Sequence, residues 1–337
     1  MIRDKQILLG HGSGGKLMHE LIEELFQPAL FLPDGQVLND AAVVRAAGAR
    51  LAMTTDSFVV DPIFFPGGDI GAMAVFGTVN DLAVSGARPL FLSAAFILEE
   101  GLPIADLSQV VASMRQACAE ADVRLITGDT KVVDRGKGDK VFINTTGIGI
   151  VEHPLEISAD RARPGDKILL NGPIAAHGVA IMLARENIEY NRPIVSDSAP
   201  LNGLVRDMLD ASLEVHCMRD LTRGGLAGAL NEIAAASHVG IRIYEDLIPI
   251  QDEVRGACEI LGLDPLHVAN EGKLIAIVSA KYVDPILASM QQNRHGQQSA
   301  IIGEVVADQP GRVLMKTTVG GYRIVDRLAG EQLPRIC

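Results

Sequence analysis

The sequence has no tryptophan, and only 4% of its 337 residues are aromatic. Flat aromatic side chains are the usual stacking surfaces for unpaired bases, so we do not expect base-stacking or sugar-stacking platforms. The formal net charge of −12 points the same way, because nucleic-acid-binding proteins carry basic surfaces. We therefore predict that nucleic acid is not a partner.

Cysteine is also scarce. The chain has four, Cys118, Cys217, Cys258 and Cys337, and none lies in a CxxC or Cys/His spacing typical of a zinc site. Few and scattered cysteines are typical of a reducing compartment, which favours a cytoplasmic location. The sequence also lacks a run of 18 apolar residues and an apolar signal segment near Met1, so we expect no membrane association.

The length and the apolar fraction of 48% favour a globular protein with two cores. Strand-like and helix-like segments alternate irregularly, which indicates α+β sheets rather than a doubly wound parallel sheet. We predict an N-terminal arm at 1–36, domains at 37–155 and 160–312, and a tail at 313–337. Predicted strands include 7–9, 37–46, 50–60, 91–98, 124–127, 140–150, 167–171, 241–244 and 274–279, and predicted helices include 17–26, 70–85, 104–121, 176–185, 201–209 and 225–237.

The segment at 10–16, GHGSGGK, has three interpretations. A P-loop requires Ser or Thr after the lysine, and this chain has Leu17 there. A dinucleotide site requires an acidic residue at the end of a second strand, whereas Asp34 lies in a Pro-Asp-Gly turn. A flexible glycine arm that donates backbone N–H groups to phosphate is favoured, and a purely structural turn is the alternative.

Four aspartates are the strongest chemical signal. Asp40 begins a predicted strand, Asp56 interrupts another, Asp81 falls in a helix of small residues, and Asp129 follows a strand. Hard oxygen ligands without nearby histidine or cysteine suit Mg²⁺ bound together with nucleotide phosphates. An aspartate taken alone is more often a helix cap or a turn former, and it is the set of four beside buried runs and small residues that favours a metal site.

Three further segments carry possible chemistry. Lys131 would supply a cation for phosphate or a general base, or else is a solvated side chain. The segment at 219–226, RDLTRGGL, is predicted to start a helix whose amide N-terminus could approach an anion. Glu271 precedes a buried strand and is either a candidate base or a turn residue.

The sequence ends on Cys337, preceded by Pro334, Arg335 and Ile336. A thiol at this position can be threaded into a pocket, although the neighbouring α-carboxylate raises its pKa. A frayed end without function is the alternative.

Together these segments resemble the aminoimidazole ribonucleotide synthetase (PurM) superfamily, and more narrowly the HypE family of hydrogenase maturation factors. The resemblance extends over essentially the whole chain. The internal motifs indicate the superfamily, and the cysteine-ending tail separates the HypE family from its relatives. The segments that carry it are 10–16, 39–42, 55–57, 80–81, 85–89, 128–131, 219–220, 222–225, 270–272 and 334–337.

The resemblance implies an N-terminal α+β domain that forms a homodimer through its sheet, and ATP with Mg²⁺ in the cleft beside a second α+β domain. It implies that the carbamoyltransferase HypF loads a carbamoyl group onto the thiol of Cys337. The resulting thiocarboxamide is dehydrated to a thiocyanate with ATP. The cyanide then passes to iron on a HypC–HypD complex, for the Fe(CN)₂CO centre of NiFe hydrogenases.

The resemblance also assigns roles to residues. Cys337 is the carrier, and Glu271 and Lys131 handle proton transfer and charge near it. Metal and phosphates are assigned to Asp40, Asp56, Asp81 and Asp129, and further ATP contacts to Gly12, Gly14, Gly15, Asn80 and Gly128.

The order of the roles of Glu271 and Lys131 stays open, as does whether the tail enters its own cleft or that of a dimer partner. The alternative functions are a superfamily kinase or amide-activating synthetase acting on a free small molecule, and a non-enzymatic scaffold for maturation proteins.

Overall fold

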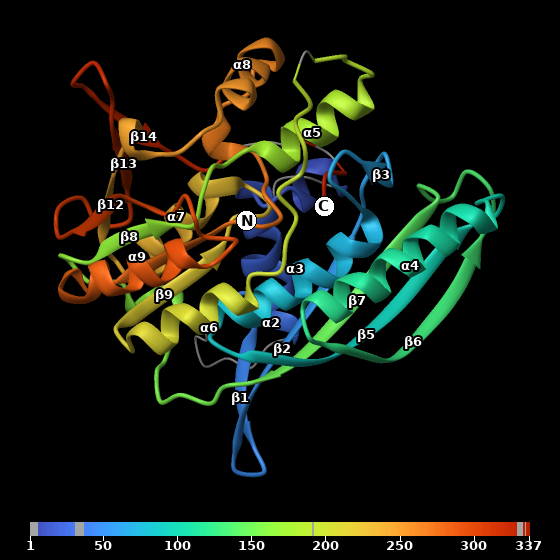
Figure 1. Cartoon of the computed structure of the whole chain (residues 1–337), viewed down its shortest axis with the longest axis horizontal. Helices are drawn as coiled ribbons and strands as arrows, with labels where there is room; N and C mark the ends of the chain where they lie inside the picture. The colour runs from blue at the N-terminus through green and yellow to red at the C-terminus, as the bar shows by residue number, and fades with distance from the viewer. Residues whose placement is uncertain (1–5, 31–36, 191, 329–332, 334) are drawn as a thin grey trace.

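The computed structural model describes residues 6–30, 37–190, 192–328, 333 and 335–337. Two sheets with their helices stand next to each other, and helix α3 (Ile70–Val84) lies between them (Figure 1). This arrangement confirms the predicted α+β fold. Asp34 and Pro334 lie outside the described residues.

The first sheet has the strand order β1-β2-β7-β5-β6. Strands β5 and β6 are parallel, and the other neighbours are antiparallel. Helices α3 and α4 (Ile104–Glu120) pack on each other, and α3 contacts β2 and β7. The strands are β1 (Ala42–Ala46), β2 (Ala49–Phe58), β5 (Arg88–Glu99), β6 (Arg124–Val133) and β7 (Val141–Ile150).

Several hydrophobic side chains on this sheet are exposed. Met53 on β2 pairs with Ile148 on β7, and both side chains are exposed. Ile97 on β5 is exposed as well. An antiparallel sheet commonly buries one face and leaves the other available to solvent or to a partner.

The second sheet has the strand order β14-β13-β10-β12-β8-β11-β9. Only β10 and β13 are parallel among its neighbouring pairs. The strands are β8 (Lys167–Leu170), β9 (Val215–Asp220), β10 (Gly240–Tyr244), β11 (Leu274–Val278), β12 (Ala300–Val306), β13 (Val313–Lys316) and β14 (Tyr322–Val325).

Helices cover both faces of the second sheet, which explains its continuous apolar strands. On β8, Ile168 and Leu170 join the cluster that contains α7 (Gly225–Ala236), whereas Leu169 joins the cluster of α6 (Asn202–Ala211) and α9 (Val283–Gln292). This alternation follows from the two-residue period of a strand. Figure 1 shows α6 and α9 over one face. Helices α5 (Ala176–Arg185) and α8 (Asp252–Leu261) pack on each other at the end of this half.

Helix α3 lies at the centre of the molecule. It is apolar on nearly every side, and 13 of its residues are buried, as expected for a helix enclosed by other elements. Asp69 caps it, because its Oδ1 accepts hydrogen bonds from the amides of Gly71 (2.7 Å) and Ala72 (3.1 Å). The polar pair Asn80 and Asp81 is thereby carried between the two sheets.

Several local predictions are wrong. Residues 7–9 form no strand; Ile7 and Leu9 are exposed, and a 3₁₀ helix (Leu9–Gly12) leads into α1 (Lys16–Leu21), η2 (Ile22–Phe26) and α2 (Gln27–Leu30). Residues 219–220 end strand β9, which was not predicted, and the helix expected from the segment at 219–226 begins only at Gly225. Asp56 and Asp129 lie inside β2 and β6. Helices α8 and α9 were not predicted, and β13 and β14 extend the second sheet beyond residue 312.

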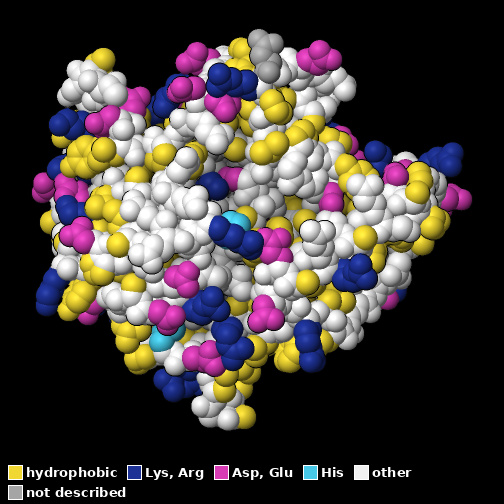
Figure 2. Space-filling model, viewed as in Figure 1, with side chains coloured by type: hydrophobic (Ala, Val, Ile, Leu, Met, Phe, Trp, Pro, Cys, Tyr) yellow, Lys and Arg dark blue, Asp and Glu magenta, His cyan; other side chains and the backbone are white. Residues whose placement is uncertain are grey.

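Acidic and basic side chains are interspersed on the face drawn in Figure 2. Within the described ranges, no helix has the length and apolar character needed to cross a membrane.

Candidate active site

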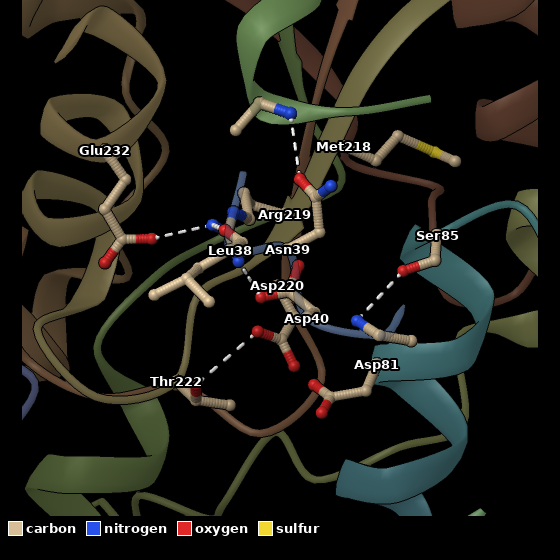
Figure 3. A network of polar contacts seen from close by, with 12 residues as sticks. Leu38, Asn39, Asp40, Asp81, Ser85, Met218, Arg219, Asp220, Thr222 and Glu232 are labelled. Carbon is tan, nitrogen blue, oxygen red and sulfur yellow. Dashed lines mark hydrogen bonds and ion pairs between the residues drawn. The ribbon is translucent and has the colours of Figure 1, made fainter. Parts of the chain in front are cut away.

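Three carboxylates converge between the sheets. Asp40 precedes β1, Asp81 lies on α3 and Asp220 ends β9, and one oxygen from each lies within 4.8 Å of the others (Figure 3). Burial raises the pKa of all three, to about 6 for Asp40. Repulsion between neighbouring carboxylates adds to the effect at Asp81 and Asp220.

Asp56 lies beside this cluster. Its Oδ2 accepts a hydrogen bond from the hydroxyl of Thr78 on α3 (3.2 Å). Burial raises its pKa, and its charge contributes to the raised pKa of Asp81 and Asp220. The structure therefore brings together three of the four predicted aspartates and adds Asp220.

Arg219 is the counterion of the cluster. Its guanidinium hydrogen-bonds to Asp40, contacts Glu232 (3.2 Å) and donates to the carbonyl of Leu38 (2.7 Å). Figure 3 shows this arginine on the side of Asp40 away from Asp81. Arg219 is shared with Glu232, so it does not neutralise three carboxylates.

The cluster fits a hard divalent cation. Oxygen ligands without histidine or cysteine are those that Mg²⁺ prefers. The Oδ2 atom of Asp220 is buried and has no hydrogen-bond partner among the described residues. A buried, unpaired carboxylate oxygen is costly, and a bound cation would satisfy it.

The end of the chain is docked against the chain's own residues. Ile336 forms an antiparallel bridge with Val60 and is only 4% exposed. The amide of Val59 donates to the carbonyl of Cys337 (3.0 Å). Arg335 adopts a φ of +51°. Figure 1 marks this end near β3 (Phe64–Phe65).

The thiol of Cys337 lies in a charged environment. Burial raises its pKa to about 12, against the opposing influence of Arg223, and the charges of Glu271, Asp56 and Asp220 raise it further. The interaction with Cys337 is in turn the main cause of the raised pKa of Arg223. The thiol of Cys337 therefore interacts electrostatically with Arg223 and with the carboxylates of the acidic site.

Glu271 is a buried carboxyl group that could accept a proton. It is 2% exposed, and neither carboxylate oxygen has a hydrogen-bond partner among the described residues. Burial, followed by the charges of Asp220 and Asp197, raises its pKa well above the usual range. Its amide donates to Asp197 Oδ1 (2.9 Å), so Asp197 fixes its backbone.

Asp129 and Lys131 are not brought to this site. They lie on β6, about two thirds exposed, and their side chains pair with each other at 2.7 Å. Neither has a hydrogen bond or ion pair to the cluster in the part of the chain that is described. Gly128 lies on the same strand, where a Cβ would meet the carbonyl of Ala94 at 2.3 Å.

The predicted nucleotide contacts have structural roles as well. Asn80 donates to the carbonyls of Ala199 (3.0 Å) and Glu271 (3.3 Å) and accepts from the amide of Leu201 (2.8 Å). The side chain of Asn80 therefore ties α3 to the second half of the molecule.

The glycine arm lies against Arg223. A Cβ on Gly14 would lie 2.7 Å from the side chain of Arg223, and one on Gly15 would lie 2.7 Å from the carbonyl of Leu328. The guanidinium of Arg223 donates to the carbonyl of Gly12 (3.3 Å). The arm and the tail thus share one arginine.

Sequence reasoning missed several residues of the site. Asp220, Arg219 and Arg223 lay in a segment taken for a helix start, although polar residues after the apolar run at 215–218 are equally typical of a strand end. Asp197 and His177 had no signal, because only the folded chain brings them to Glu271 and to the tail.

Comparisons with known proteins identify the family of the chain. The N-terminal domain model of the AIR synthase related proteins matches residues 38–151, and the C-terminal domain model matches 163–316. The chain is 54% identical to carbamoyl dehydratase HypE of Azotobacter vinelandii, over 100% of this chain and 98% of that protein.

Solved structures are similar too. A HypE–HypF complex matches with a TM-score of 0.87 and 47% identity, covering 91% of this chain and 99% of the other. HypE in complex with ATP matches with a TM-score of 0.83 and 49% identity, covering 98% and 100%.

Proposed function

The chain belongs to the HypE family of carbamoyl dehydratases within the AIR synthase related proteins, and we propose that it dehydrates an S-carbamoyl group on its own Cys337 with ATP. The product, S-cyanato-cysteine, supplies cyanide ligands for NiFe hydrogenase maturation. The observation that carries the proposal is the docked tail, whose thiol interacts electrostatically with Arg223, Glu271 and two aspartates of the acidic site.

ATP is the phosphoryl donor in this proposal, supported by the similarity to a HypE structure in complex with ATP. Mg²⁺ would be held by Asp40, Asp81 and Asp220, with Asp56 beside them. The bound cation supplies charge neutralisation for the phosphates. The glycine arm at 12–15, which lies against Arg223, would supply backbone amides to the phosphates.

The reaction has to remove an oxygen that leaves poorly. Phosphorylation of the amide oxygen, with loss of one N–H proton, gives an iminophosphate and ADP. Removal of the second N–H proton then expels phosphate and forms the S–C≡N group. Arg223 would balance negative charge near the sulfur, because its charge already interacts with Cys337.

Glu271 is our candidate for the proton acceptor. A carboxyl group with a raised pKa is a stronger base once it is ionised than an ordinary glutamate. Its two oxygens have no hydrogen-bond partner within the described ranges, so they are free to receive the amide protons.

Loading by HypF requires the tail to leave this pocket, and the similarity to a HypE–HypF complex supports HypF as the loading partner. We further propose delivery of the cyanide to iron on a HypC–HypD complex. The four free cysteines of the chain support a cytoplasmic location.

We also propose a homodimer through the first sheet, where Met53, Ile97 and Ile148 are exposed. Asp129 and Lys131 on β6 would then act in a partner's site, since they have no contact with their own cluster. The two domains would follow the predicted boundaries, with the second extended through β14.

A mass measurement tests the dehydratase proposal. The protein is incubated with HypF, carbamoyl phosphate and ATP, and the peptide that contains Cys337 is followed in time. We expect a carbamoyl group to appear on Cys337 and then to lose one water. Cys118→Ser should behave as the wild type, and Cys337→Ser should stay unmodified. Absence of the carbamoyl group, or of the later loss of water, would contradict the proposal.

A further inference from the structure

One buried histidine contacts the tail directly. His177 lies in the first turn of α5 and has no exposed surface. Its Nε2 atom lies 2.8 Å from the carbonyl oxygen of Ile336, and its Nδ1 atom lies 2.7 Å from the hydroxyl of Ser196. The ring of Phe65 meets it edge-on, with the centroids 5.5 Å apart.

These contacts determine the tautomer of His177. A backbone carbonyl only accepts hydrogen bonds, so Nε2 must carry the proton and donate it to Ile336. Burial lowers the pKa of His177, which favours the neutral ring. In that ring Nδ1 is an acceptor, and the hydroxyl of Ser196 donates to it.

The other contacts to the tail backbone differ in kind. The amides of Val59 and Asp61 donate to the carbonyls of Cys337 (3.0 Å) and Arg335 (3.3 Å), and the guanidinium of Arg185 donates to the Arg335 carbonyl (2.6 Å). His177 is the fully buried side-chain donor among these described contacts. When the tail leaves, its N–H loses its partner inside the protein, and an unsatisfied buried donor is unfavourable.

We propose that His177 is a positioning residue that latches the tail in its docked state. The latch acts on the carbonyl of Ile336, next to the reacting cysteine, and therefore sets how often the loaded thiol is presented to the site. This inference rests on the proposed function, because it assumes that the tail must both dock for dehydration and leave for loading.

The test compares His177→Leu with His177→Gln. Leucine removes the donor, whereas glutamine keeps an N–H that can reach the same carbonyl. Loss of one buried hydrogen bond predicts a docked state that is about five- to tenfold less favoured. Alkylation of Cys337, followed by mass spectrometry of its peptide, should accelerate by that factor in His177→Leu and stay near the wild-type rate in His177→Gln.

Two further readouts separate a latch from general damage. Single-turnover dehydration of the preloaded protein should slow in His177→Leu by a similar factor, while loading by HypF does not slow. Alkylation of buried Cys217 should be unchanged, which shows that the core is intact.

Wild-type alkylation of Cys337 in His177→Leu would overturn the inference, as would an equal acceleration at Cys217 or a failure of His177→Gln to restore the wild-type rate. Failure of the proposed function looks different, because then the wild-type protein itself would not be loaded or would not lose water.

Discussion

Replacing Asp81 by asparagine should make the ligand-free protein more stable while removing its cation site. Asp81 is half-buried beside two other carboxylates of the cluster, and no ion pair to it occurs among the described residues. The hydroxyl of Thr54 donates to Asp81 Oδ2 (2.7 Å). An asparagine oxygen can accept the same hydrogen bond, so the change removes charge and little else.

The size of the effect follows from Coulomb's law. Two unit charges no more than 4.8 Å apart repel by at least about 3.5 kcal/mol at an effective dielectric constant of about 20. Partial protonation of the cluster and the charge of Arg219 reduce this value. We therefore expect Asp81→Asn to stabilise the ligand-free protein by about 2 kcal/mol at pH 8, which corresponds to a rise in Tm of about 4 °C.

The sign of the pH dependence is fixed by the raised pKa of Asp81. Between the unfolded pKa and the higher folded pKa, the folded protein binds more protons than the unfolded chain. The free energy of unfolding then falls as the pH rises. The advantage of Asp81→Asn should therefore shrink as the pH is lowered from 8 towards 5.

Thermal unfolding between pH 5 and 8, first with a chelator and then with Mg²⁺ and ATP, measures both effects. Wild-type protein should gain stability from the ligands by mass action, and Asp81→Asn should not. For the stability of the ligand-free protein, Asp129→Asn is the matched control, because Asp129 is exposed and its loss should change that stability by less than about 1 kcal/mol. An Asp81→Asn protein that is less stable than wild type at pH 8, or that keeps its Mg²⁺-dependent shift, would refute the reasoning.

Two other substitutions test the framework around the site. Asn80→Ala leaves the amide of Leu201 without its hydrogen-bond partner. The free energy of unfolding, measured in urea, should therefore fall by about 3 kcal/mol. A fall below about 1 kcal/mol would contradict the structural role of Asn80. Gly225→Ala forces a Cβ to 2.6 Å from the carbonyl of Val268 at a φ of +59°, so we expect a loss of at least about 2 kcal/mol in thermal unfolding. Gly228→Ala is its control, because the nearest atom lies at 3.5 Å and alanine favours a helix; equal losses in both variants would count against the strain.

The sequence predicted individual site residues better than it predicted which of them the fold brings together. Asp40 and Asp81 were recognised because an Asn-Asp pair beside small residues is a local pattern. Asp220 was missed as a ligand because apolar runs followed by polar residues suit both a strand end and a helix start. The order of strands, which joins residues 40, 81 and 220, depends on contacts between distant segments.

Dependence on contacts between distant segments also explains why the sequence did not predict the residues that hold the tail or the positions of Asp129 and Lys131. A docked tail was foreseen as one possibility, but which residues would hold it was not, because a lone histidine on a helix carries no local signal. Asp129 and Lys131 share a motif with the other site residues, yet β6 carries them to the edge of the sheet.

The backbone of Arg335 has a consequence for turnover. A non-glycine residue at a φ of +51° is strained by about 1 kcal/mol relative to its preferred conformations, and the released tail is free to relax. The strain therefore destabilises the docked state, and the equilibrium constant for release is roughly fivefold larger than that of an unstrained tail. A tail that docked too stably would be released too slowly for repeated loading. The strained backbone of Arg335 weakens docking and so favours repeated turnover.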